Sequence, residues 1–553
     1  MTMTIMTTDS GQRRPQRLLS GIRFVGMSAL FFSLSGCDVL LPQPVEQAAS
    51  PAPPQQRVAQ AQPPPPPVRQ TPPLARQPVL KPLPSGGTSQ SLGPSCEGIT
   101  ESVGKNPLAT TRSQRRTRLK NAVVVLGMDA LEPTLIERMV SEGELPHFAQ
   151  IGKEGFRSKM RISYPIVSPS VWTSLASGYP SDKHGIPNWT GSNGKPFRSM
   201  DVKVQRVWDV ATQHNKTSWV LNWLLTMPVS SIQGVMTSEE LVFVGGLDSV
   251  GQHPPNRDPA ITSQMLVSPD DFCKIAADQV PALDWVNSTA LDYQFDRYSV
   301  VRHPLLRDEA TVRLFEALVG SPAPDLAMVY LSGADALSHR LWPFTDAEAV
   351  AQMTADPTLW KRSNDDLKRH EHNKRRRPFS DGDTTPEMLK QGRRMVEDYY
   401  RYLDSLLGRV MDRMDPKHST LVLVSDHGFK TADQPVPLYP AHSDHGVLMG
   451  WGSQVKQGQA ESKEPRDLDV APTVYALLGL PVAVDMDGRI LSEHFETPGK
   501  TTVPSYATAS LLTTAARPVD FQRLPELQAL GYVDEEGRPL DAVLPSQPQG
   551  SGQ

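Results

Sequence analysis

Apolar residues in this chain are gathered into short continuous runs separated by polar segments. The runs lie at 121–127, 219–223, 326–331, 420–425 and 447–449. A run of this length without polar alternation is typical of a strand buried on both faces of a sheet. Segments 133–142, 170–177 and 387–414 instead carry apolar residues at helical spacing. Strands that alternate with helices predict an α/β fold, with a mainly parallel central sheet flanked by helices.

An aspartate closely follows each of three predicted strands. Asp129 comes after the run that ends at 127, Asp335 after the run that ends at 331, and Asp426 directly after the run that ends at 425. A single aspartate at a strand end is often only a loop residue or a helix cap. Ligands of open α/β sheets bind at the carboxyl ends of the strands. Aspartates at the same relative place on three strands therefore predict a shared site.

Histidines accompany these aspartates. His339 lies four residues after Asp335, so one helical turn would place both side chains on one face. His427 directly follows Asp426, and His442 lies downstream. Mixed aspartate and histidine ligands suit zinc, with manganese or iron as alternatives. The cluster offers enough ligands for two divalent cations, which together are a known device for in-line displacement at phosphorus.

Composition separates the ends of the chain from its middle. The chain has 553 residues, of which 52 are proline and only 38% are hydrophobic. Its early part is rich in Pro, Gln, Ala and Ser and cannot bury enough apolar surface to offset chain entropy. We expect a lipoprotein-type signal peptide at 1–37, a Pro-rich disordered linker at 38–118, a catalytic domain at 119–535 with cap insertions at about 189–302 and 345–386, and a disordered tail at 536–553.

The first residues resemble a bacterial export signal. Arginines precede an apolar stretch at 24–34 that is too short to span a bilayer. This stretch leads into Leu-Ser-Gly-Cys37, which resembles a lipobox. We therefore expect an exported cell-envelope lipoprotein, held through lipidated Cys37 at the periplasmic face of a bacterial membrane or at the cell surface. The alternative is a lone cysteine in an ordinary signal peptide.

Charge and the remaining cysteines add little. The formal net charge of −4 gives no indication of nucleic acid as a partner. In an exported protein Cys96 and Cys273 could form a disulfide, and two free thiols are the alternative. With 3 cysteines in all, the chain has too few for a cysteine-based zinc site.

Several motifs resemble, in number and order, those of the type I phosphodiesterase/nucleotide pyrophosphatase branch of the alkaline phosphatase superfamily. The resemblance runs from about residue 121 to about residue 532. It rests on segments 125–129, 165–178, 184–186, 335–339, 425–428, 442–448 and 469–489. The resemblance implies an alkaline phosphatase-like catalytic domain.

Carried over to this sequence, the resemblance implies two metal sites and a serine nucleophile. One metal would be held by Asp335, His339 and His442, and the other by Asp129, Asp426, His427 and the oxygen of the nucleophile. In the family the nucleophile lies ten residues before the glycine of the following helix, an interval that Ser168 and Gly178 fit. Ser170 is the competing assignment, although it also suits a helix N-cap.

The expected activity is hydrolysis of a phosphodiester or phosphomonoester substrate through a covalent phospho-serine at Ser168. Two alternatives stay open. The chain could be a phosphoryl-group transferase or mutase of the same superfamily. It could also be a non-catalytic surface lipoprotein that uses the fold to bind an anion or a partner.

Overall fold

The structure is a computed structural model that describes residues 117–239, 252–253, 302–370, 382–458, 463–497 and 501–508. The signal peptide, Cys37, both other cysteines, nearly all of the linker and the tail lie outside the described residues, so the expectations about them stay predictions. Within the described ranges no helix combines the length and the apolar character needed to cross a membrane.

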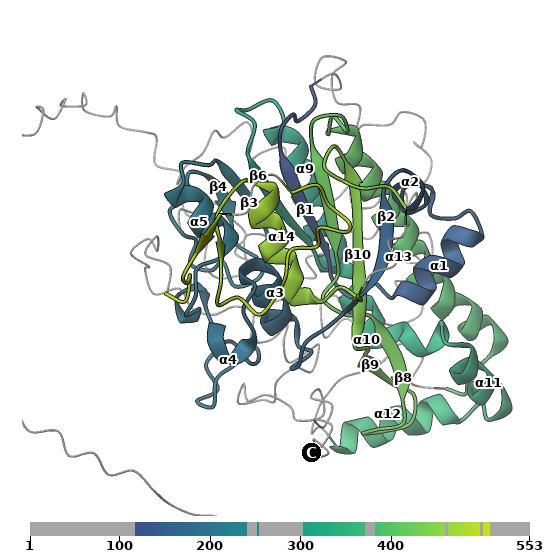
Figure 1. The fold of residues 1–553 in the computed structure, drawn as a ribbon. Coiled ribbons are helices and arrows are strands. Elements are labelled where there is room, and N and C mark those ends of the chain that lie inside the picture. The colour runs from purple at the N-terminus through teal and green to yellow at the C-terminus, as the bar shows by residue number, and fades with distance from the viewer. Residues whose placement is uncertain are drawn as a thin grey trace, which may run out of the picture. The chain divides into compact units, whose positions relative to one another are not determined.

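An eight-stranded sheet forms the centre of the domain, in the order β2-β10-β7-β1-β6-β3-β4-β5 (Figure 1). Its strands are β1 (Val123–Met128), β2 (Phe156–Arg161), β3 (Ser218–Leu221), β4 (Gly234–Thr237), β5 (Gln252–His253), β6 (Leu326–Leu331), β7 (Thr420–Val424) and β10 (His445–Gly452). Strands β7, β1, β6, β3 and β4 are parallel, and β2, β10 and β5 pair antiparallel at the two ends. The predicted α/β fold with a mainly parallel sheet is confirmed.

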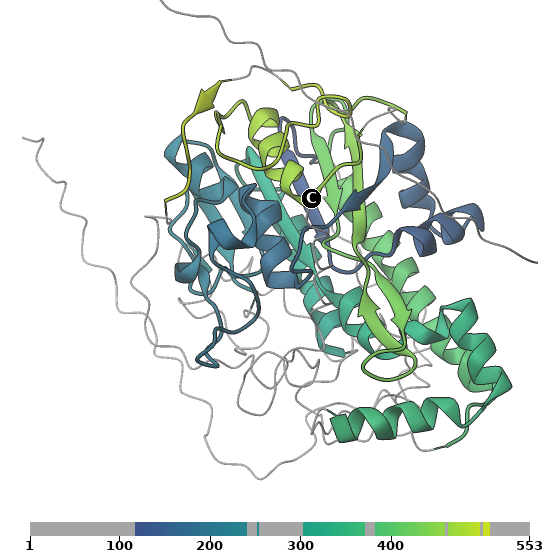
Figure 2. The same ribbon diagram turned by 60° about the horizontal axis from the view of Figure 1, so that its bottom comes forward.

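Alternate side chains of the central strands enter two hydrophobic cores, one on each face of the sheet. Val124 and Leu126 face one core, and Val123 and Val125 face the other. The first core is covered by α1 (Pro133–Ser141), α2 (Pro146–Glu154), α9 (Arg302–Leu318), α10 (Gly333–Leu341), α11 (Ala347–Ala355), α12 (Leu359–His370) and α13 (Pro386–Asp412). The second is covered by α3 (Ser168–Ser177), α5 (Val207–Gln213) and α14 (Val470–Leu477) (Figure 2). The continuous apolar runs thus reflect burial on both faces.

Smaller elements complete the described chain. They are α4 (Ser181–His184), η3 (Ser199–Asp201), η4 (Trp342–Phe344) and η5 (Asp467–Asp469), with the pair β11 (Val482–Ala483) and β12 (Thr502–Val503) and the hairpin of β8 (Phe429–Ala432) and β9 (Tyr439–His442). The hairpin extends below the sheet, next to α10 (Figure 1).

The described part of segment 189–302 differs from the expected cap. It contributes α5 to the core and both β3 and β4 to the central sheet. Its apolar runs are short and lie among loops, which made the segment resemble an insertion. The rest of this segment, apart from β5, lies largely outside the described residues.

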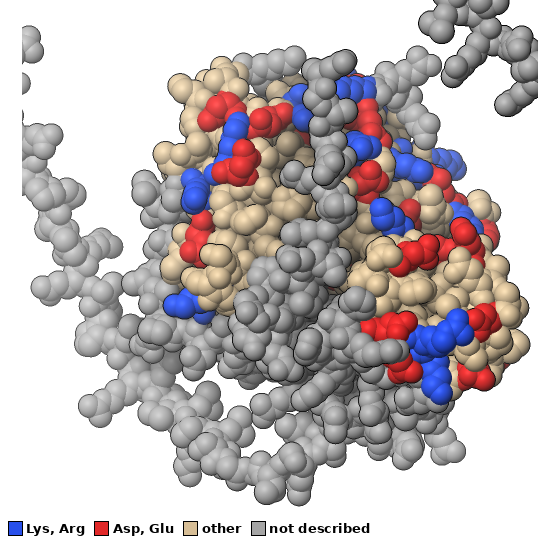
Figure 3. Space-filling model, turned by 90° about the horizontal axis from the view of Figure 1, so that it is seen from below, with Lys and Arg blue, Asp and Glu red and all other residues tan. Residues whose placement is uncertain are grey.

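The expected insertion 345–386 forms helices α11 and α12 in its described part. The segment contains many basic residues, which could attract anions or simply be solvated. Arg362 pairs with Asp356 at 2.6 Å, with both side chains about half exposed. Acidic and basic side chains are interspersed on the described surface of the face seen from below (Figure 3). For these described residues, a solvated charged surface is the better interpretation.

Candidate active site

Adjacent parallel strands deliver the predicted aspartates to one edge of the sheet. Asp129 follows β1 and Asp426 follows β7, and the two strands pair with Gly127 opposite Val424. On the other side of β1, β6 leads into α10, whose first turn carries Asp335. Because β7, β1 and β6 are neighbours, the three carboxylates converge, as the rule for parallel sheets predicts.

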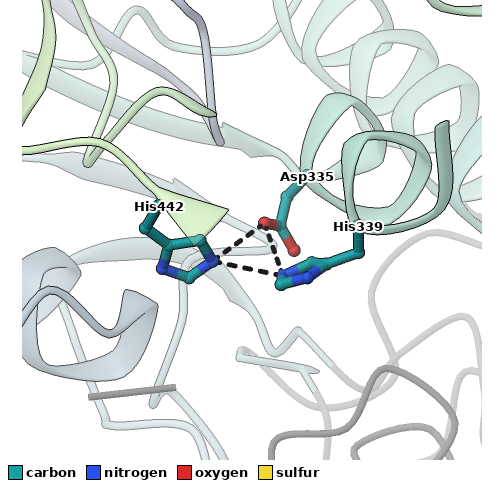
Figure 4. A group of neighbouring side chains, drawn as sticks. All are labelled: Asp335, His339 and His442. Atoms are coloured by element: carbon teal, nitrogen blue, oxygen red, sulfur yellow. Dashed lines mark hydrogen bonds and ion pairs between the residues drawn. The ribbon is translucent and has the colours of Figure 1, made fainter. Parts of the chain in front are cut away.

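Asp335, His339 and His442 form the first buried group (Figure 4). Asp335 and His339 are one turn apart on α10, with His339 Nε2 3.2 Å from Asp335 Oδ1. His442, at the end of β9, brings its Nε2 to 3.2 Å from His339 Nε2 and 3.9 Å from Asp335 Oδ1. All three ligand atoms point toward one another, and all three residues are buried.

Asp129, Asp426 and His427 form the second buried group. His427 Nε2 lies 3.3 Å from Asp426 Oδ2 and 3.6 Å from Asp129 Oδ1. Ser168 Oγ lies 3.5 Å from the same nitrogen. In each group the ligand atoms are within 4.8 Å of one another.

The β8–β9 hairpin joins the two groups. Its register places Phe429 opposite His442, so the chain before β8 and the end of β9 lie side by side. The rings of His427 and His442 consequently stack, with centroids 3.7 Å apart and planes 16° apart. His427 Nε2 is also 3.9 Å from Asp335 Oδ1. The two groups are therefore neighbours at a single site.

Backbone carbonyls orient two of the imidazoles. His427 Nδ1 lies 3.1 Å from the Gly428 carbonyl oxygen, and His442 Nδ1 lies 3.1 Å from the Ile166 carbonyl oxygen. A carbonyl can only accept, so each Nδ1 carries the proton and donates it. The lone pair is then on Nε2, the atom that faces the carboxylates. This is the arrangement of metal-binding histidines.

Burial gives the site unusual electrostatics. Burial, followed by the charge of Asp335, raises the pKa of Asp129 to about 8. Burial and the charge of Asp129 also raise the pKa of Asp426 well above its ordinary value. Burial and the neighbouring His339 lower the pKa of His442 to about 4. Carboxylates and imidazoles therefore disfavour their charged forms here. A divalent cation would stabilise the charged carboxylates, and it would bind the imidazoles in their neutral form.

The donor atoms fit divalent metals. Asp129 Oδ1 and Asp426 Oδ2 are buried and have no hydrogen-bond partner among the described residues. Buried polar atoms are rarely left without a partner. Carboxylate oxygens, imidazole nitrogens and a hydroxyl together suit zinc, and manganese and iron also accept them. Each group could hold one cation.

Ser168 is the first residue of α3, whereas the sequence predicted the helix from residue 170. It is 1% exposed, and its hydroxyl faces the second group. Ser170 is also buried, two positions further into the first turn. The geometry thus brings the predicted nucleophile to the predicted ligands, which come from strand ends far apart in the sequence.

Sequence reasoning missed the aromatic residues that hold Asp129. Tyr330 and Trp172 donate hydrogen bonds to Asp129 Oδ2 at 2.5 Å and 3.2 Å. Their rings pack edge-to-face with centroids 4.9 Å apart. Tyr330 lies in an apolar strand and Trp172 in an apolar helix, where aromatic residues usually belong to the hydrophobic core. The sequence therefore did not indicate that they bind Asp129.

Asp308 on α9 was also missed. It accepts hydrogen bonds from the backbone N–H groups of Ser332 and Gly333 at 2.9 Å and 3.1 Å, and from the Tyr399 hydroxyl at 2.9 Å. These contacts fix the start of α10, the helix that carries Asp335. A carboxylate at a helix N-terminus is also favoured by the helix dipole.

Three further histidines, His184, His418 and His445, belong to neither group. His184 is buried beneath α3, 3.2 Å from Ser174 Oγ. His418 is exposed and pairs with Asp415 at 2.9 Å. His445 lies 3.0 Å from Glu464.

Comparison with known protein families shows which family the chain belongs to. The sequence profile of type I phosphodiesterase/nucleotide pyrophosphatase matches residues 123–494, which contain the whole central sheet and both groups. The chain belongs to this family. As a type I phosphodiesterase/nucleotide pyrophosphatase family member, it is a phosphoester hydrolase.

Solved structures offer more distant similarities. The alkaline phosphatase PafA is 12% identical, with 68% of this chain and 99% of that chain covered and a TM-score of 0.43. A putative sulfatase from Bacteroides thetaiotaomicron is 11% identical, with 70% and 76% covered and a TM-score of 0.42. A phosphonate monoester hydrolase from Silicibacter pomeroyi is 13% identical, with 73% and 78% covered and a TM-score of 0.34. A comparison with curated proteins found no match.

Proposed function

We propose that this family member is a two-metal phosphodiesterase or phosphomonoesterase that acts through a covalent phospho-serine at Ser168. The observation that carries the proposal is the convergence of the two ligand groups on one buried place beside the Ser168 hydroxyl. The groups would hold one divalent cation each, with zinc as the first candidate and manganese or iron as alternatives.

The residues of the chain support each step. Bound cations would lower the pKa of the serine hydroxyl and neutralise charge on the leaving oxygen. Ser168 Oγ loses its proton to solvent and forms a bond to phosphorus, while the bond from phosphorus to the leaving alcohol oxygen breaks. That oxygen takes a proton from water. Water then forms a bond to phosphorus and gives up a proton, while the bond from phosphorus to Ser168 Oγ breaks and that oxygen takes up a proton. This restores the serine and releases the phosphate product.

The position of Ser168 assists this chemistry. As the first residue of α3 it lies at the positive end of the helix dipole, which favours an anionic phosphoryl group. Tyr330 and Trp172 hold Asp129, so the second group keeps its shape during the reaction.

Hydrolysis of p-nitrophenyl phosphate and bis-p-nitrophenyl phosphate tests the proposal. We expect turnover that a chelator abolishes and added zinc restores, and the ratio of the two rates assigns monoesterase or diesterase activity. Absence of turnover of both esters in metal-loaded protein would favour the non-catalytic binding protein. Release of nitrophenol with the phosphoryl group passed to an added alcohol would instead favour the transferase.

A further inference from the structure

One buried carboxylate belongs to neither ligand group, yet it contacts a chain segment next to each of the two groups. Glu132 lies three residues after Asp129, as the N-cap of α1, and is 8% exposed. Its Oε1 accepts hydrogen bonds from the backbone N–H and the hydroxyl of Thr134, at 3.3 Å and 2.9 Å. This half of the carboxylate performs an ordinary capping role.

The other oxygen faces the site. Glu132 Oε2 accepts a hydrogen bond from the Phe429 backbone N–H at 3.1 Å and lies 3.1 Å from the Ser443 hydroxyl, which is also 3.1 Å from the His445 carbonyl. Phe429 lies two residues after His427, and Ser443 directly follows His442. A single oxygen atom therefore connects a segment of the second group with a segment of the first.

The surroundings hold Glu132 in this place. A Cβ atom at Gly428 would lie 2.1 Å from Glu132 Oε2 and 3.1 Å from Glu132 Cα, so the approach needs a glycine there. The Tyr400 hydroxyl accepts the Glu132 backbone N–H at 2.9 Å and is 3.1 Å from the Ala130 carbonyl. Ala130 has a positive φ of 61°, so the loop between β1 and α1 is tightly defined. Glu132 is thus fixed from its backbone to its carboxylate.

We propose that Glu132 is a positioning residue that keeps the histidine ligands of both metal groups in register. This inference rests on the proposed function, because it assumes that the groups bind metals. Glu132 is not a further ligand, since both of its oxygens accept hydrogen bonds from protein donors. Partners of this kind outside the ligand shell set the orientation of the ligands and so the metal affinity.

Glu132→Gln tests the inference in the full chain. The amide keeps the shape but brings an NH₂ group against either the donors on Thr134 or the Phe429 N–H and the Ser443 hydroxyl. We expect zinc affinity at both groups to fall by about 10- to 100-fold, measured by competition with a chelator below the unfolding temperature of the metal-free variant. Turnover should recover at saturating zinc, which a loss of catalytic chemistry would not allow.

Two control variants separate position from charge and capping. Glu137→Gln makes the same charge change on the exposed face of α1, and Thr134→Val removes only the hydroxyl that donates to Oε1. Both are expected to bind zinc as the parent does. Ser443→Ala, which removes one donor to Oε2, should weaken mainly the group that contains His442, and it keeps the test decisive if Glu132→Gln does not fold.

The outcomes distinguish this inference from the proposed function. If the parent does not bind two equivalents of zinc, the proposed function itself fails. If the parent binds two and both Glu132→Gln and Ser443→Ala bind them equally tightly, the positioning role is wrong. A fall in affinity equal to that of Glu137→Gln would also overturn it, because the effect would then be one of charge alone.

Discussion

Ser168→Ala is expected to lower phosphoester turnover by at least about 10³-fold, because the covalent step loses its nucleophile. The buried hydroxyl is 3.5 Å from His427 Nε2, and alanine fits the same space at the start of α3. The six aspartate and histidine ligands remain, so metal content at saturating zinc should stay close to that of the parent. Steady-state kinetics and elemental analysis of the same preparation measure both quantities.

Ser170→Ala is the matched control for this experiment. It removes a buried serine hydroxyl from the same helical turn, and Ser170 was the competing nucleophile in the sequence. We expect it to keep turnover within a few fold of the parent. Activity lost in Ser170→Ala and retained in Ser168→Ala would reverse the assignment.

Asp426→Asn is expected to reduce bound zinc from two equivalents to one. Asp426 Oδ1 accepts the Ala130 N–H at 3.2 Å, so the amide of asparagine would place its NH₂ where Oδ2 faces the second group. A donor there opposes a cation, whereas the group of Asp335, His339 and His442 is untouched. Turnover should fall by more than about 100-fold. A loss of about 100-fold is the largest expected when the substituted residue only supports a metal ligand and does not bind the metal itself.

This substitution should not unfold the metal-free protein. Burial raises the pKa of Asp426 well above its ordinary value, so the charged carboxylate is disfavoured in the folded chain and a neutral amide removes that cost. Asp467→Asn is the control, since Asp467 is also buried and its Oδ2 has no hydrogen-bond partner among the described residues. It lies outside both groups and should retain two equivalents of zinc. One equivalent in both variants would mean that the loss is not specific to the second group.

The sheet and the meeting of Asp129, Asp335 and Asp426 were predictable because each depends on a local pattern with a fixed spatial consequence. The division into two ligand groups was implied by the resemblance to the family. Continuous apolar runs identify buried parallel strands, and the carboxyl ends of such strands share one edge. Asp129 and Asp426 could therefore be placed together although they are far apart in the sequence. Asp426 lies 296 positions after Ala130, whose backbone N–H it accepts. The spacing of Asp335 and His339 also needed only the geometry of one helical turn.

Other parts depended on contacts that no local pattern specifies. Strands β8 and β9 have 4 residues each, too few for a clear alternation, yet their pairing sets the distance between His427 and His442. Glu132 would be an ordinary helix cap by its sequence position, and Tyr330 an ordinary core residue. Their roles follow from neighbours hundreds of positions away, such as Ser443 for Glu132 and Asp129 for Tyr330.

The most direct test of the central claim is anomalous diffraction from crystals of the zinc-loaded protein, recorded on both sides of the zinc absorption edge. The account predicts two anomalous peaks about 3.5–4 Å apart. One should lie among Asp335, His339 and His442, and the other among Asp129, Asp426 and His427 with Ser168 Oγ beside it. Zinc bound only elsewhere on the chain, or a single peak at saturating zinc, would contradict it.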